Sequence, residues 1–149
     1  MTATNFKNLL RKNLDDVKKP EPVPEGSYRG KLLSYSMENS ARKGTPYVRF
    51  QVGLREALEG VDTDELKEAL QGAALETKKL RKDFYMTDEA LYRLKDFFKS
   101  LSIEIQGRSI EECLVDTKDQ EVLVEVTKRP SEDGKEFYND VKELSGLGD

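Results

Sequence analysis

The stretch Pro46-Tyr47-Val48-Arg49-Phe50-Gln51-Val52-Gly53-Leu54 alternates side chains with a period of two. One parity is apolar (Val48, Phe50, Val52, Leu54), and the other carries Tyr47, Arg49, Gln51 and, just beyond, Arg55. Successive side chains of a strand point to opposite faces, so this alternation predicts a strand with one buried and one solvated face. It also predicts that Tyr47 and Arg49 share the solvated face.

Four other segments have the character of strands. They are Ser27 to Met37, Leu75 to Met86, Glu121 to Arg129 and Glu136 to Leu144. The last two are separated by a polar loop with Asp133-Gly134, which is a typical hairpin signal. In the third strand Lys82 interrupts the alternation, which predicts a β-bulge at that residue.

Helical patterns interrupt the strands at three places. A short helix, capped by Thr63 and ending at Leu70, is predicted as an insertion between the second and third strands. A longer amphipathic helix from Asp88 to Leu101, capped by Thr87, follows the third strand. Ser109 and Glu112 have the spacing of a capping box and predict another short helix before the fourth strand.

The N-terminal residues form a separate unit. Residues 5–19 have apolar side chains at helical spacing (Phe6, Leu9, Leu10, Leu14, Val17), and a connector with Pro20, Pro22 and Pro24 follows. We therefore divide the chain into an arm and connector at 1–21, a folded domain at 22–145 and a short tail at 146–149. For the arm, three roles stay open: self-association into a homo-oligomer, a clamp against the domain, and a partly ordered tail.

Composition argues against catalysis. The 149 residues include no histidine, which is the commonest general base and zinc ligand, and a single cysteine, Cys113. Phosphate-binding glycine loops and nucleophile-elbow motifs are also missing from the sequence. We expect no enzyme activity, no cofactor and no metal, and we interpret the acidic cluster around Asp62 to Glu68 as a solvated helix.

The order of three strands, a helix and two strands is that of the OB-fold, a five-stranded, partly open Greek-key barrel. The predicted fold class is therefore mainly β with helices. Its five-stranded OB-fold barrel has a helix between strands 3 and 4 and a short helical insertion between strands 2 and 3. Such barrels use the face of strands 2 and 3 and the neighbouring loops to bind oligonucleotides or oligosaccharides.

The net charge of −4 hides a strong asymmetry. Residues 27–55 carry six basic side chains against one acidic, and residues 75–86 carry four against two. The acidic excess lies in residues 56–74 and 111–149. Because a polyanion responds to the local patch, the first three strands are the predicted nucleic-acid-binding region.

Binders of single strands that tolerate any sequence combine a basic groove with aromatic rings on which bases stack. Tyr47 is the preferred platform, whereas for Tyr35 and Tyr85 core packing and stacking stay equally open. Phe137 or Tyr138, beside the last hairpin, would extend the platform. The candidate nucleic-acid-binding residues are Lys31, Tyr35, Arg42, Lys43, Tyr47, Arg49, Arg55, Lys79, Arg81, Tyr85 and Phe137.

The ordered motifs resemble the OB-fold single-stranded-DNA-binding proteins of tailed bacteriophages. They are Pro24-Glu25-Gly26-Ser27-Tyr28-Arg29-Gly30-Lys31, Lys43-Gly44-Thr45-Pro46-Tyr47-Val48-Arg49-Phe50, Asp83-Phe84-Tyr85-Met86-Thr87, Leu91-Tyr92-Arg93-Leu94-Lys95 and Phe137-Tyr138-Asn139-Asp140-Val141. The resemblance implies an accessory protein that coats single-stranded DNA during replication, recombination or repair. Many such proteins end in an acidic tail that recruits partners. This sequence ends Ser145-Gly146-Leu147-Gly148-Asp149, which puts such recruitment in doubt.

Two functions are carried forward. The first is sequence-tolerant binding of single-stranded DNA, and the alternative is a non-catalytic protein-interaction module of a replication or recombination complex. A carboxylate-based hydrolase is the weakest reading, because these spacings predict no paired carboxylates. Neither a membrane span nor a secretory leader is predicted, and the single cysteine fits a reducing compartment. The expected location is the cytoplasm, that of the host cell if the protein is encoded by a phage.

Overall fold

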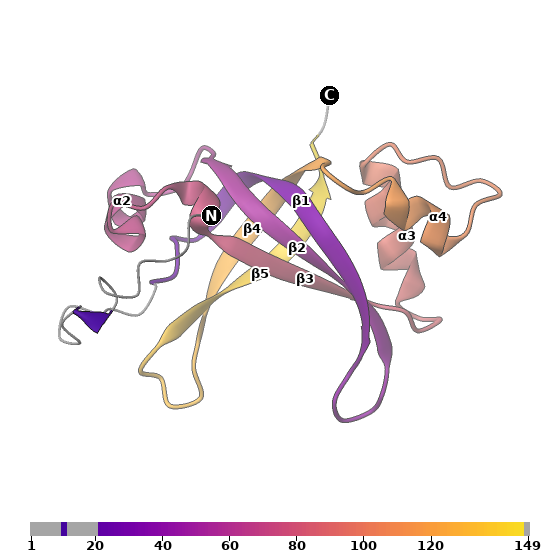
Figure 1. Ribbon diagram of the computed structural model, residues 1–149, viewed down its shortest axis with the longest axis horizontal. Coiled ribbons are helices and arrows are strands. Elements are labelled where there is room, and N and C mark those ends of the chain that lie inside the picture. The colour runs from indigo at the N-terminus through magenta and orange to yellow at the C-terminus, as the bar shows by residue number, and fades with distance from the viewer. Residues whose placement is uncertain (1–9, 12–20, 148–149) are drawn as a thin grey trace.

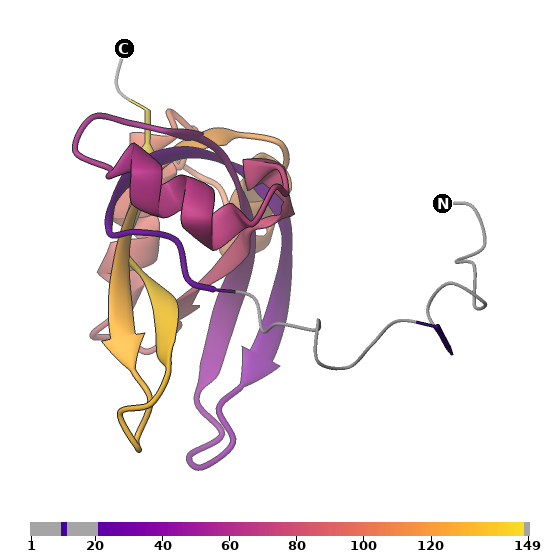
Figure 2. The ribbon, with the colours of Figure 1, turned by 90° about the vertical axis from the view of Figure 1, so that its left-hand side faces the viewer.

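The computed structural model describes residues 10–11 and 21–147. The proposed N-terminal arm lies outside the described residues except for Leu10 and Arg11, and so does the end of the proposed tail. Everything between Glu21 and Leu147 belongs to one continuous unit of a curled sheet with helices at its ends (Figures 1 and 2). None of the described helices is long and apolar enough to cross a membrane.

Five antiparallel strands form one sheet, in the order β3-β2-β1-β4-β5. The strands are β1 (Gly26–Asn39), β2 (Pro46–Ala57), β3 (Lys79–Tyr85), β4 (Glu121–Pro130) and β5 (Phe137–Gly146). All five predicted strands are thus confirmed, although the third begins later than predicted, because Leu75–Thr77 form a 3-10 turn, η2. Hairpins β1–β2 and β4–β5 project in the same direction from the sheet (Figures 1 and 2).

The long strand β1 organises the curvature of the sheet. It pairs with β2 from Tyr28 to Asn39 and with β4 through Gly26 to Lys31. Its ladder with β2 shifts register twice, once at Arg55 and once at Leu33, each of which is left without a paired partner. Such bulges bend a strand and increase its twist, which lets the sheet curl.

Strands β3 and β5 are the two edges of the sheet and lie beside each other across a narrow seam. Lys82 spans this seam: its ammonium donates to the backbone carbonyls of Val141, 3.4 Å away, and Lys142, 3.5 Å away. The predicted bulge at Lys82 is wrong, because the β2–β3 ladder is continuous from Tyr47↔Tyr85 to Gly53↔Lys79. Lys82 interrupts the alternation because its side chain satisfies carbonyl groups of an edge strand.

Three α-helices accompany the sheet within residues 21–147. The insertion helix α2 (Thr63–Leu70) ends where predicted but already includes Thr63, because Asp62 rather than Thr63 is its N-cap. Helix α3 (Leu91–Ser100) begins three residues later than predicted. The side chain of Thr87 does not cap α3, since residues 87–90 form a turn in which the Thr87 carbonyl accepts from Ala90 and Leu91. Helix α4 (Ile110–Val115) begins at Ser109 with the predicted capping box to Glu112.

The core lies between the concave face of the sheet and α3. The rings of Phe50, Phe84 and Phe97 form its centre, with centroids 5.0 to 5.7 Å apart in edge and stacked arrangements. The end of β5 lies very close to α3. A Cβ added at Gly146 would lie 1.9 Å from the carbonyl oxygen of Ser100, so only glycine allows this approach.

Two connections hold the other elements against the sheet. The backbone N–H and carbonyl of Val23 both bond to the Asn139 side chain, at 2.8 and 3.0 Å, which secures the entry to β1 on β5. Glu65 of α2 pairs with Lys128 of β4.

The chain is mainly β, with a helix between strands 3 and 4 and the predicted helical insertion between strands 2 and 3. Closure of the sheet into an OB-fold barrel stays a prediction.

Candidate nucleic-acid interface

The outer face of β2 and β3 carries the alternation from which the fold was predicted. Cross-strand partners on this face are Tyr47 with Tyr85, Arg49 with Asp83 and Gln51 with Arg81. Residues paired across neighbouring strands share a face, so the predicted division of β2 and β3 into two faces is confirmed. This face joins six of the predicted site residues, namely Tyr47, Arg49, Arg55, Lys79, Arg81 and Tyr85.

Arg49 is neutralised by carboxylates. Its guanidinium donates to both oxygens of Asp83, at 2.8 and 3.1 Å, and lies 3.6 Å from a carboxylate oxygen of Glu38. The hydrogen bond to Asp83 is the main reason that the pKa of Arg49 is raised above its ordinary value. A phosphate that approached Arg49 would have to compete with a bidentate carboxylate, so Arg49 is a weak candidate for a backbone contact.

The Tyr47 ring, the preferred stacking platform from the sequence, is covered. Only 8% of Tyr47 is exposed, because Tyr85 packs against it at 5.5 Å between centroids and the Arg49 guanidinium lies 5.2 Å from its centroid. Tyr85 itself is 46% exposed. The exposed ring on this face is therefore that of Tyr85, which packs against the buried ring of Tyr47.

Tyr35 lies on the opposite face from the one that its position in the sequence predicts. The register shift at Leu33 turns the following residues of β1 over, so that Tyr35 pairs with the buried Phe50, with ring centroids 6.4 Å apart. A shift of one residue exchanges the two faces of a strand. The assignment of Tyr35 to the nucleic-acid face is wrong, and its half-buried ring packs against the core.

The basic residues of β1 have acidic neighbours. Lys31 lies 3.8 Å from Asp119, and Arg29 bonds to Glu121 at 2.8 Å. Arg55, at its bulge, fills the space beside Gly53, where an added Cβ would lie 3.1 Å from the guanidinium, and it donates to the Leu54 carbonyl. The first strand thus contributes less free positive charge than its composition predicts.

The free positive charge lies instead on and just before β3. Lys78, Lys79, Arg81 and Lys82 make no ion pair with any carboxylate among residues 21–147. Lys78 and Lys82 bond only to backbone carbonyls, those of Glu21 and of β5. We name these four residues the β3 cations.

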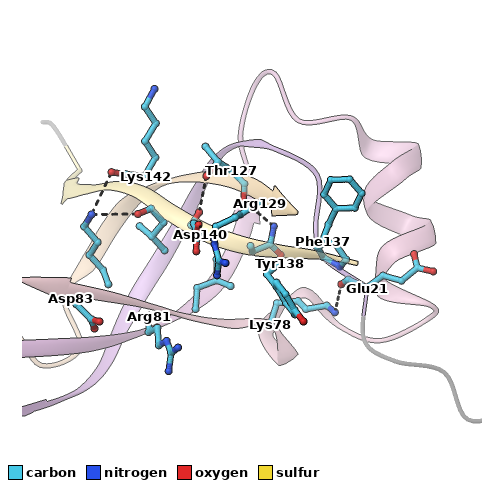
Figure 3. A pocket seen from close by; sticks show the side chains of 15 residues that line it. Glu21, Lys78, Arg81, Asp83, Thr127, Arg129, Phe137, Tyr138, Asp140 and Lys142 are labelled. Atoms are coloured by element: carbon cyan, nitrogen blue, oxygen red, sulfur yellow. Dashed lines mark hydrogen bonds and ion pairs between the residues drawn. The ribbon is translucent and has the colours of Figure 1, made fainter. Parts of the chain in front are cut away.

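A groove of about 790 Å³ runs along the seam beside the β3 cations, and we name it the β3–β5 groove. It is lined by Glu21 and Pro22, by residues 78 and 80–83, by Thr127 and Arg129 of β4, and by residues 137–142 of β5. Figure 3 shows Arg81 and Asp83 pointing away from β5 while Lys78 lies at the end of the groove where Tyr138 projects. Two of the three carboxylates of the groove are already paired, Asp83 with Arg49 and Asp140 with Arg129.

Two exposed rings border this groove. Tyr138 and Phe137 are neighbours on β5 and point to opposite sides of the strand (Figure 3). The guanidinium of Arg129 lies 5.6 Å from the centroid of Tyr138, whose hydroxyl bonds to Glu136. Both rings are thus exposed beside the groove, and the extension of the platform by Phe137 or Tyr138 stays a prediction.

Beyond Lys82 the seam continues into a second hollow of about 480 Å³ between β3, β5 and α3. Lys82 and Lys142 line both hollows, and Arg93 of α3 lines the second. Arg42 and Lys43 are exposed in the β1–β2 hairpin loop, which leads into Pro46 beside the end of β3, and neither makes an ion pair in the part of the chain that the structure describes.

Sequence reasoning missed Lys78 and Lys82. The sequence did mark Lys82 as unusual, because a lysine among the apolar residues of a strand needs a polar partner for its ammonium. That partner, the backbone of β5, can be identified only once β5 is placed beside β3. Lys78 precedes its strand and had no periodic signal.

The acidic cluster has structural contacts: Asp62 accepts from the backbone of Asp64 and Glu65, and no group of metal-ligating side chains converges among residues 10–11 and 21–147.

Unpaired cations beside exposed rings can bind a flexible polyanion that also presents aromatic bases. Comparison with known proteins gives a family without a described activity. A family described as a protein of unknown function (DUF669) matches residues 12–146, which is most of the chain. No curated protein matches it.

Proposed function

We propose that this chain, which belongs to the DUF669 family, binds single-stranded DNA along β3 and the β3–β5 groove without reading its sequence. The observation that carries the proposal is that the β3 cations, three on the strand and Lys78 just before it, have no carboxylate partners among the described residues and lie beside a groove bordered by exposed rings. Cations on β1 and β2, by contrast, are largely paired.

The arrangement favours single strands over duplex. Bases of a single strand are free to stack on side chains, at about 1–3 kcal/mol per base, whereas duplex bases already stack on one another. Tyr85 on one side and Tyr138 with Phe137 on the other offer rings on both sides of the β3 cations. Stacking reads no donor or acceptor pattern, so the binding tolerates any sequence.

We also propose that the domain is an OB-fold. Three features support this: β1 pairs with both β2 and β4, a helix connects β3 to β4, and the edge strands β3 and β5 lie beside each other. OB-folds bind oligonucleotides on the face of strands 2 and 3, which is the face that carries Tyr85 and Arg81. The site proposed here shifts from that face toward strand 5.

The biological role that follows is protection or organisation of single strands during replication or recombination, in the cytoplasm of the cell that contains them. A protein-interaction module is the alternative. It would leave the β3 cations without a polyanion to bind, so the two functions differ in affinity for strands of nucleic acid.

Fluorescence anisotropy with labelled oligo-dT and a duplex of equal length tests the proposal. Oligo-dT is expected to bind more tightly than the duplex, with an affinity that falls by about 0.7 logarithmic units per phosphate contact for each tenfold increase in salt. Equal affinity for both, or none for either, would refute the proposal.

A matched pair of variants locates the site. Lys79→Gln with Arg81→Gln removes two of the β3 cations, and Lys67→Gln with Lys99→Gln removes the same charge from exposed positions on α2 and α3. The first pair is expected to weaken binding on the order of tenfold near 0.1 M salt and to reduce the salt slope by about 1.4. If both pairs change affinity equally, only the net charge matters and the site is wrong.

A further inference from the structure

Helices α3 and α4 enclose a second groove, of about 350 Å³, on a different part of the molecule from the β3–β5 groove. We name it the α3–α4 groove. Its lining is predominantly apolar and includes Leu91, Leu94, Phe98, Ile105, Ile110 and Cys113. Tyr92 and Ile110 are exposed at its edge. Two exposed large apolar residues beside an apolar groove mark a surface that a partner covers.

The chain itself contains a segment with the chemistry to fill this groove. Residues 5–19 place Phe6, Leu10, Leu14 and Val17 three or four residues apart, which is how an amphipathic helix presents anchors to an apolar groove. Leu10 lies within the described part of the chain and is 84% exposed. The side chain of Leu10 is thus exposed to solvent and accessible to another copy of the chain.

Charge favours the same pairing. Residues 1–20 contain five basic and two acidic side chains. Residues 88–119, which form α3, α4 and their connections, contain eight acidic and five basic. Two charged residues line the groove, Lys95 and Arg108, and Arg108 is already paired with Asp116 at 2.8 Å. The arm and residues 88–119 thus have opposite net charges, which favours a long-range approach, whereas contact at the groove itself, whose two charged side chains are basic, relies on apolar side chains.

The position of Glu21 relative to the groove favours a contact between two copies. Glu21, where the arm joins the domain, bonds to Lys78, and the adjoining insertion helix α2 lies at the end of the sheet opposite to α3 and α4 (Figure 1). An arm that leaves one end and a groove at the other end join head to tail. Such heterologous contacts extend a chain of molecules instead of closing a dimer.

We propose that the N-terminal arm of one copy docks in the α3–α4 groove of the next copy. The contact does not depend on nucleic acid, and on a strand it would make binding of neighbouring copies cooperative. Sedimentation velocity without nucleic acid tests it through two variants of the full chain. The arm variant carries Leu10→Asp and Leu14→Asp, and the groove variant carries Tyr92→Asp and Ile110→Asp.

The wild-type chain is expected to form species that grow with concentration beyond two copies, and each variant is expected to sediment as one chain. A mixture of the two variants keeps one intact groove and one intact arm, so it is expected to form a complex of two chains and nothing larger. Val115→Asp, on α4 outside the groove, is the control and is expected to associate like the wild type. Circular dichroism verifies that the variants are folded.

A wild-type chain that sediments as a single copy at every concentration would overturn the proposal. So would association that survives both variants, or variants that fail to complement each other in the mixture. Because the measurement contains no nucleic acid, each of these outcomes leaves the proposed strand binding to be judged by its own experiment.

Discussion

Asp83 of β3 holds Arg49 of β2 through two hydrogen bonds, at 2.8 and 3.1 Å, on the face that the proposed site shares. The pair removes one positive charge from the surface beside the β3 cations. Asp83→Asn keeps the shape of the side chain and removes the bidentate carboxylate, which leaves Glu38, 3.6 Å away, as the carboxylate beside the guanidinium. It is therefore expected to increase affinity for oligo-dT and to steepen the salt dependence by about 0.7 for one added phosphate contact.

Asp83→Asn has a useful control in Glu143→Gln, which removes one carboxylate from an exposed position on β5 that makes no ion pair among residues 21–147. Both variants change the net charge equally. Anisotropy titrations at several salt concentrations separate a local contact from a general charge effect. If Glu143→Gln increases the affinity by the same factor as Asp83→Asn, the effect is one of net charge and Arg49 does not contact the strand.

For the packed rings of Tyr47 and Tyr85 we expect two different phenotypes. Tyr85→Ala removes an exposed ring and is expected to weaken binding by about 1–3 kcal/mol while stability stays within about 0.5 kcal/mol. Tyr47→Ala removes a covered ring and is expected to lower the free energy of unfolding by about 3 kcal/mol. Urea denaturation and anisotropy on both variants distinguish these effects, and a Tyr85→Ala variant that binds normally would exclude stacking at this ring.

Ionisation of the Tyr28 hydroxyl is expected to lower the free energy of unfolding at high pH. Its buried hydroxyl donates to the Pro24 carbonyl at 2.7 Å, and burial, with a smaller contribution from Glu65, raises its pKa from 10.0 to about 12. The unfolded chain therefore releases this proton at lower pH than the folded chain. The stabilisation is complete below pH 10 and is lost as pH rises through 12, by up to about 1.4 kcal/mol per pH unit.

The comparison that isolates this group is Tyr28→Phe. The variant is expected to be less stable than the wild type at pH 8, by about 1 kcal/mol for the lost hydrogen bond. Since it has no hydroxyl to ionise, its free energy of unfolding should fall less steeply between pH 10 and 12. Parallel pH dependences in urea denaturation would show that Tyr28 does not titrate in this range.

The pattern of β2 was sufficient to predict its two faces, because its buried and solvated residues differ strongly in polarity. The same reasoning failed for Tyr35, since a bulge at Leu33 reverses the faces of β1 and no feature of the sequence marks it. Periodicity also assigns a face but not an exposure. The covering of Tyr47 by Tyr85 depends on the register between strands, which the sequence of either strand alone does not contain.

The charges of the candidate site show the same limit. Counting residues predicted a basic region on β1 to β3, and the cations are present there. Their pairing with distant acids, such as Arg29 with Glu121 ninety-two positions away, is a consequence of topology. The cations without a carboxylate partner among the described residues are therefore fewer than the composition of β1 to β3 predicts. Those of the proposed site lie on and just before β3, beside a seam that no local pattern could predict.

Gly146 provides a test of how β5 is held against α3. A methyl group at this position would lie 1.9 Å from the Ser100 carbonyl oxygen, so Gly146→Ala must separate the end of β5 from the helix. The separation would also lengthen the hydrogen bond from the Gly146 N–H to the Ser100 hydroxyl, now 2.9 Å. We expect a loss of about 1–3 kcal/mol in the free energy of unfolding, measured by urea denaturation.

Ser145→Ala, one residue earlier, is the control and should cost about 0.5 kcal/mol or less. Since the obstacle is a backbone atom, no change of the Ser100 side chain should restore stability, and a Gly146→Ala variant as stable as wild type would contradict this close approach.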